Sequence, residues 1–342
     1  MNCTSQIYVY LYASDMLQSK KNKSKPWWMA VKLLIALAAL WFIYVRVIEK
    51  ENAGDWWTGA GKSLRDSDHF GWFLLVLLLM FVNWSIEAFK WKLIMQRLER
   101  ISFIRSLEAI FSGITISFFT PNRIGEYAGR VFHLEKADRI EATLLTVLEN
   151  FSQLVITLIV GAIASVLYLQ VYSTIPAYLE NAIIALLMTV STGALLFYFN
   201  ASFLEAVFRK LKLPESWKSY LKVFSLYSNT ELIRVLLLAL LRYIVFSGQF
   251  YILLWIFGID LSYSAAMTLI AVTYLVMSVF PTFALTELGV RGAVATFFFA
   301  SVTDNLSGVI NASFSLWLIN LAAPALLGIF FVFEFKFARR KA

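Results

Sequence analysis

Six runs of mostly apolar residues, each longer than 20 residues, constrain this chain more than any other feature. A helix needs about 20 such residues to cross the hydrocarbon core of a bilayer, so each run is long enough to span a membrane. Of the 342 residues, 60% are hydrophobic and only 15% are charged, whereas soluble domains have about 45–50% and about 25%. The sequence therefore predicts an all-α polytopic membrane protein. The predicted spans are residues 27–48, 70–91, 142–169, 178–199, 231–258 and 308–334.

Two further apolar segments are interrupted by proline. Residues 104–120 lead into Pro121 and residues 264–280 lead into Pro281, and each proline is followed by polar residues and a second short apolar piece. Interrupted helices at membrane depth occur where protein covers them or where they line a polar cavity. We therefore expect two re-entrant or broken helical hairpins besides the six spans. Two full crossings in each region would fit the charges equally well.

The distribution of Lys and Arg predicts the orientation. Basic residues concentrate in the N-terminal tail, in segments 90–105 and 200–228, and at the C-terminus, whereas loops 170–177 and 259–263 contain none. Cytoplasmic loops carry the excess of basic residues in membrane proteins. We therefore expect both termini to be cytoplasmic, in the inner membrane of a bacterial cell. Segment 200–228 also carries apolar side chains, so it is either an amphipathic helix on the anionic inner leaflet or an ordinary basic loop.

The expected organisation is a single domain. Residues 27–334 form the transmembrane part, between a basic cytoplasmic tail of residues 1–26 and a second one of residues 335–342. The N-terminal tail lacks the pattern of a secretory signal peptide. Met16 is an alternative start to Met1.

The two prolines mark an internal repeat, because they lie 160 residues apart and each precedes a glutamate that is followed, four residues later, by an arginine. These residues are Pro121, Glu126 and Arg130 in the first copy, and Pro281, Glu287 and Arg291 in the second. The halves, about 70–170 and 231–334, would cross the membrane in opposite directions. Inverted repeats of this kind usually build transporters, with the substrate site near the midplane where broken helices meet.

Ionisable residues in the apolar segments are the candidate binding residues, since a charge at the bilayer centre costs about 2.5–3.5 kcal/mol on insertion scales. Arginine suits a phosphate, and a carboxylate suits an amine or a hydroxyl. The candidates for substrate binding are Glu126, Arg130, Glu149, Arg242, Glu287 and Arg291.

Alternatives remain for these charges. Each glutamate and the arginine four residues later can pair along a helix, and the first pair would be ordinary if it lay in a cytoplasmic loop. Glu149 and Arg242 either line a cavity or pair with each other as a structural bridge. Glu87 lies near the inner end of its span, where we expect solvent to reach it.

Other chemistry has little support in the sequence. The one cysteine, Cys3, excludes a disulfide framework or a cysteine-based metal site, and only two histidines are present. No phosphate-binding P-loop occurs. His133 and Asp138 have the spacing of the His-x4-Asp pair of glycerolipid acyltransferases, in which the aspartate orients a general base. We expect no cofactor, no metal, no nucleic-acid partner and no catalytic site.

The chain resembles a known family in three places. The segments Asn83–Trp91, Thr120–Glu126 and Pro281–Arg291 are similar to the lysylphosphatidylglycerol synthase transmembrane region, or flippase-like domain proteins, and the resemblance covers about residues 27–334. In relatives this region moves aminoacylated phosphatidylglycerol between leaflets, and a separate soluble domain synthesises it. That soluble domain does not follow residue 334, so the resemblance implies translocation or binding of a polar lipid without aminoacyl transfer.

The family motifs imply two structural hairpins. The corresponding residues are Pro121, Gly125 and Glu126 in the first motif, and Pro281, Glu287 and Gly289 in the second. Residues 282–285 lack the glycines that commonly follow the second proline, so the backbone of this hairpin is expected to differ from that of the family, and the resemblance does not identify the substrate.

The sequence thus favours a flippase-like transporter of a polar lipid headgroup. Its expected partners are a phospholipid or other polar lipid and the anionic membrane surface, together with a second copy of the chain or a lipid synthase. Two alternatives are a non-transporting membrane partner of a lipid synthase and a membrane-embedded enzyme that modifies a lipid headgroup.

Overall fold

The computed structural model describes residues 67–118, 120, 123–200, 220, 222–280 and 284–338. These residues form helices and connections, with no strand among them. The predicted span 27–48, the N-terminal tail, residues 339–342 of the C-terminal tail, most of segment 200–228, and both Pro121 and Pro281 lie outside the described residues. Residues 335–338 of the predicted C-terminal tail are the end of a helix.

Five helices of the described part are long and apolar enough to cross a membrane. They confirm the spans predicted after residue 67. Four of them extend past the predicted bounds by up to four residues, and the helix predicted at 231–258 begins and ends two residues earlier, at 229 and 256. Their bounds are α4 (Ser67–Met95), α7 (Arg139–Tyr172), α8 (Ala177–Phe199), α11 (Asn229–Ile256), and a continuous helix made of α14 (Leu306–Trp317), the π-helical η4 (Leu318–Ala322) and α15 (Ala323–Ala338).

The two interrupted segments form pairs of shorter helices. The first pair is α5 (Phe103–Phe118) and α6 (Gly125–Val131), and the second is α12 (Tyr263–Val279) and α13 (Ala284–Phe299). The members of each pair pack against one another. A short 3₁₀ turn, η3 (Lys222–Leu226), precedes α11.

Side-chain caps define where several helices begin. The Asp138 carboxylate accepts hydrogen bonds from the N–H groups of Ile140 and Glu141 at the start of α7. Ser228 and Glu231 form a reciprocal capping box at the start of α11. Such residues satisfy N–H groups that have no partner within the helix, so the local sequence alone favours these boundaries.

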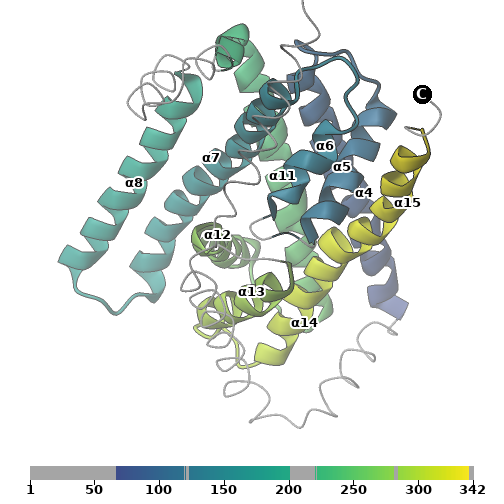
Figure 1. The fold of residues 1–342 in the computed structure, drawn as a ribbon. Helices are drawn as coiled ribbons and strands as arrows, with labels where there is room; N and C mark the ends of the chain where they lie inside the picture. Colours follow the sequence, from purple (N-terminus) through teal and green to yellow (C-terminus); the bar gives the residue numbers. More distant parts are fainter. Residues whose placement is uncertain are drawn as a thin grey trace, which may run out of the picture.

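Helices that are far apart in the sequence pack side by side (Figure 1). Helix α4 lies along α11, α5 packs against α15, and α12 packs against α7. Helix α8 lies beside α7 at one side of the molecule, and much of its apolar surface is exposed, including Tyr178, Leu186 and Leu196. Large exposed apolar surfaces of this kind are stable in contact with lipid and not in water.

Candidate functional site

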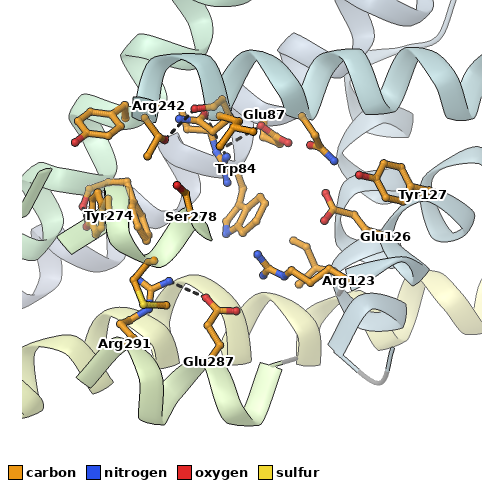
Figure 2. A pocket seen from close by; sticks show the side chains of 18 residues that line it. Trp84, Glu87, Arg123, Glu126, Tyr127, Arg242, Tyr274, Ser278, Glu287 and Arg291 are labelled. Carbon is orange, nitrogen blue, oxygen red and sulfur yellow. Dashed lines mark hydrogen bonds and ion pairs between the residues drawn. The ribbon is translucent and has the colours of Figure 1, made fainter. Parts of the chain in front are cut away.

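A cavity of about 480 Å³ lies between the two short-helix pairs and the long helices α4, α7 and α11. Figure 2 shows Glu126 and Tyr127 on one side of it and Arg291 and Tyr274 on the other. Four of the six predicted binding residues line this cavity, and they come from three different helices, α6, α11 and α13. These residues are Glu126, Arg242, Glu287 and Arg291.

The other two, Arg130 and Glu149, lie behind the cavity wall in a buried charge cluster. The Arg130 guanidinium donates to Glu87 at 2.8 Å, to Glu149 at 2.9 Å and to Glu126. Lys90 completes the cluster, with its Nζ atom 2.9 Å from Glu87 Oε2 and 2.7 Å from Glu149 Oε1. Lys90, Arg130 and Glu149 are fully buried, so these charges are held by one another and not by solvent.

Arg242 joins this cluster to the cavity. Its Nε lies 3.4 Å from Glu87 Oε2, and its guanidinium lies over the Trp84 ring, 5.0 Å from the ring centroid. The three carboxylates of the cluster, Glu87, Glu126 and Glu149, are therefore matched by three cations, Lys90, Arg130 and Arg242. A buried set of charges is tolerated when it is balanced in this way.

The second predicted pair is present on α13. The Arg291 guanidinium donates to Glu287 at 2.7 Å, and both residues are largely buried at the cavity wall. Arg291 also lies over the Phe246 ring, 5.8 Å from its centroid. Both predicted i,i+4 Glu–Arg pairs, on α6 and on α13, are thus observed as ion pairs.

Two glycines explain why α6 can bring Glu126 and Arg130 to this position. A Cβ atom on Gly129 would lie 2.6 Å from the Gly113 Cα atom, so only glycine allows α5 and α6 to approach this closely. Gly125 begins α6, and its N–H donates to the Thr120 hydroxyl at 2.8 Å. Gly289 lies inside α13 and not in a turn.

One expectation for the charged residues is wrong, and two of the alternatives left open by the sequence are not observed. Glu87 is 1% exposed and not solvated, because α4 places it against Arg130 and Lys90. Glu149 does not pair with Arg242, since its two carboxylate oxygens are bound by Lys90 and Arg130. Glu126 and Arg130 lie on a helix at the cavity and not in a loop.

The sequence interpretation also missed Lys90, which was counted with the basic residues of a cytoplasmic segment. A signal was present, because Asn83, Glu87 and Lys90 are spaced to share one face of α4. All three are buried, and the Asn83 side-chain amide donates to Asn320 of the π-helical turn η4 at 3.3 Å. A polar face inside an apolar span is itself a signal of a buried network.

The two residues with the acyltransferase-like spacing, His133 and Asp138, have separate contacts in the structure. Asp138 caps α7 with its carboxylate, and the His133 Nε2 atom lies 2.8 Å from the Ser112 hydroxyl. Burial lowers the pKa of His133 to about 4, and the nearby Arg105 adds to this effect. In the described part of the chain, no three His, Cys, Asp or Glu side chains are grouped as metal ligands.

Comparison with known families agrees with this architecture. The sequence model described as "Lysylphosphatidylglycerol synthase TM region" matches residues 29–328, which is most of the chain. The chain belongs to this family. It is therefore an integral membrane protein of the lysylphosphatidylglycerol synthase transmembrane-region family, as the sequence motifs indicated. No curated protein and no solved structure matches the chain.

Proposed function

We propose that this protein is a flippase-like transporter that moves a polar lipid headgroup across the cytoplasmic membrane. The observation that carries the proposal is the charged cavity, which lies inside a set of membrane-spanning helices and between two short-helix pairs. A lipid headgroup needs a polar path through the hydrocarbon region, whereas its acyl chains can remain in the bilayer. The family match supports a role with lipids.

The lengths of the short helices support re-entrant hairpins. Helix α5 has 16 residues and α6 has 7, which correspond to about 24 Å and about 10 Å at 1.5 Å per residue. Neither reaches the thickness of about 30 Å of the hydrocarbon core. Helices α12 and α13, with 17 and 16 residues, are similarly short. Each pair would enter the membrane and leave it on the same side.

The packing pattern supports an inverted repeat. In such a repeat, the first half comprises α4, α5, α6 and α7, and their counterparts in the second half are α11, α12, α13 and the α14–α15 helix. The observed contacts fit this correspondence. The contact of α5 with α15 has its counterpart in the contact of α12 with α7, and α4 packs against its own counterpart, α11. The close approaches correspond as well. A Cβ on Gly328 would overlap the Thr115 hydroxyl, and one on Gly161 would overlap the Leu275 side chain, which lies 160 residues after Thr115.

This arrangement assigns two kinds of role to the charged residues. Glu126, Arg242, Glu287 and Arg291 line the cavity and would contact the headgroup. Arg130 and Glu149 are held behind the wall and would position Glu126 and Glu87. With both termini in the cytoplasm and residues 27–334 as one transmembrane domain, exchange of the two halves would open the cavity to either leaflet in turn.

The test is headgroup translocation in proteoliposomes. Fluorescent lipids with anionic, zwitterionic and aminoacylated headgroups are reconstituted with the full chain, and loss of fluorescence after addition of a membrane-impermeant reductant reports movement to the outer leaflet. We expect at least one lipid to move faster than in empty vesicles. The variants Glu126→Gln and Glu287→Gln should slow it about tenfold, the loss that removal of one charged hydrogen bond produces.

The matched control is Glu180→Gln, which makes the same chemical change on α8, away from the cavity. It should transport as the wild type does. Transport that is equal in wild type and in both cavity variants would contradict the assignment of the site. Absence of transport for every lipid would contradict the proposed function.

A further inference from the structure

Arg123 is a charged residue of the cavity that the binding motifs did not point to. It lies in the connection between α5 and α6, and its guanidinium points into the cavity beneath Trp84, towards Glu287 (Figure 2). Its backbone is in the left-handed region, with φ of 57°. Arginine rarely adopts this conformation, because the Cβ atom makes it unfavourable by about 1 kcal/mol or more, and residues held in it cluster at functional sites.

The Arg123 side chain lies near Glu287 (Figure 2) but forms no ion pair with it. Its Nε atom is buried, and no described residue accepts a hydrogen bond from it. Within the described part of the chain, no carboxylate forms an ion pair with Arg123, whereas Arg130, Arg242 and Arg291 each have at least one. The Nε atoms of those three arginines also lack a hydrogen-bond acceptor among the described residues, so the missing ion pair is what distinguishes Arg123. Leaving a buried guanidinium nitrogen without a partner is unfavourable, so an acceptor brought by a ligand would stabilise this arrangement.

The charged residues around the cavity carry a net charge of one positive unit. The described residues of the cavity and of the cluster behind it comprise four carboxylates and five cations. The carboxylates are Glu87, Glu126, Glu149 and Glu287, and the cations are Lys90, Arg123, Arg130, Arg242 and Arg291. Every carboxylate in this set is already bound by a cation. The site therefore has an unmatched cation and no unmatched anion.

We infer that the cavity selects a headgroup with one net negative charge, a phosphodiester whose second substituent is an uncharged, hydroxyl-bearing group, and that Arg123 binds its phosphate. That the ligand is a lipid rests on the proposed function. The phosphodiester would neutralise the surplus charge, and guanidinium groups bind phosphate oxygens through two parallel hydrogen bonds. The hydroxyl-bearing substituent would face the polar side chains of Asn150, Gln153 and Thr157.

A zwitterionic or cationic headgroup fits this charge balance poorly. Its ammonium group would need a free carboxylate, yet Glu126 is bound by Arg130 and Glu287 by Arg291. An ammonium would therefore enter a site that already carries an excess positive charge, in surroundings where water does not screen it.

The experiment measures equilibrium binding and does not depend on transport. The full chain is purified in an uncharged detergent, and binding is followed calorimetrically with three probes: short-chain phosphatidylglycerol, short-chain phosphatidylethanolamine and the tail-free glycerophosphoglycerol. We expect phosphatidylglycerol to bind about tenfold or more tightly than phosphatidylethanolamine. Arg123→Gln should remove this difference by weakening only the binding of phosphatidylglycerol.

Two further variants test whether a loss of binding in Arg123→Gln comes from the missing guanidinium or from a general loss of charge or folding. Arg100→Gln makes the same change at an exposed arginine outside the cavity and should bind as the wild type does. Arg123→Gly should lose the preference while folding at least as well as the wild type, because glycine adopts positive φ without strain.

Each outcome decides the inference. Equal affinities for the two lipids, a preference that survives in Arg123→Gln and Arg123→Gly, or no binding of any probe would overturn it. Equally tight binding of glycerophosphoglycerol would support the phosphodiester site and show that its ligand is soluble, which would count against the lipid transport function while leaving the role of Arg123 in place. Preferential binding of phosphatidylglycerol without any translocation would likewise support the role of Arg123 and count against the transport function.

Discussion

The buried charges show how individual residues depend on one another. Lys90 bridges Glu87 and Glu149, and all three side chains are withdrawn from solvent. Removing one member of a buried ion pair leaves an uncompensated charge, which costs about 3–5 kcal/mol, whereas removing a matched pair costs much less. The stability of this region is therefore set by the balance of the cluster and not by any single pair.

This argument predicts non-additive stability. Lys90→Met should lower the free energy of unfolding by about 3–5 kcal/mol, and Lys90→Met combined with Glu149→Gln should lose about 1–3 kcal/mol less than the sum of the single variants. The midpoint of unfolding in detergent measures this. Lys92→Met, two residues along the same helix, is the control and should change the free energy by less than about 0.5 kcal/mol. Simple additivity would show that the three charges are not coupled.

A single residue also holds the connection between α6 and α7. The Glu99 carboxylate accepts hydrogen bonds from the N–H groups of Glu135, Lys136 and Ala137, at 2.7–3.2 Å. Burial raises the pKa of Glu99, but these hydrogen bonds outweigh that effect and hold the pKa below its usual value. A lowered pKa in the folded state means that the stabilisation is present above the unfolded pKa, about 4.3, and is lost as the pH falls through the folded pKa.

Glu99→Gln should therefore lower the free energy of unfolding by about 1 kcal/mol at pH 7, a value reduced because the carboxylate is partly exposed to solvent. The difference between wild type and variant should begin to shrink as the pH falls below the unfolded pKa, about 4.3, and should disappear once the carboxyl group of the folded wild type takes up a proton. Melting curves of both proteins at pH 7 and at pH 3.5 give the comparison. A difference that is independent of pH would rule out ionised Glu99 as the cause.

At the scale of elements, the approach of α5 to α6 decides where Glu126 and Arg130 lie. The two helices touch at Gly113 and Gly129, where even one added methyl group would meet backbone atoms. Gly129→Ala should force the pair apart, with a loss of about 1–3 kcal/mol, as overpacking in a core produces. Binding of lipid probes should weaken too, because the charged residues move with α6.

Gly193→Ala is the matched control for this prediction. It makes the same change on α8, where a Cβ atom would meet nothing within 4 Å, and alanine favours a helix over glycine by about 1 kcal/mol. Thermal unfolding and ligand binding should be unchanged or slightly improved. If Gly129→Ala behaved like Gly193→Ala, the close contact would not be what positions α6.

At the scale of the whole molecule, the orientation in the membrane is open to a direct test. Cys3 is the only cysteine, so Cys3→Ser provides a background in which single cysteines can be placed. Thr174→Cys, in the exposed connection between α7 and α8, should react with an impermeant thiol reagent in intact cells. Lys136→Cys, in the exposed connection between α6 and α7, should react only after permeabilisation. The reverse pattern would place the termini outside the cytoplasm.

The sequence by itself determined the parts of this protein that depend on local chemistry. Apolar runs predicted the spanning helices, the capping residues Asp138 and Ser228 favour where α7 and α11 begin, and the spacing of Glu126 with Arg130 and of Glu287 with Arg291 predicted both ion pairs. These features follow from neighbours within one or two helical turns, and so they can be read along the chain.

Only the tertiary structure decided which charges meet. Glu149 is bound by Lys90 and Arg130 and not by Arg242, and Arg123 forms no ion pair with a described carboxylate, because helices far apart in sequence fix the distances between their side chains. Periodicity shows that a residue is on a polar face, but it does not show which of several opposite charges lies within reach. That choice depends on how α4, α6, α7 and α11 pack, and it decides where the surplus positive charge of the cavity lies.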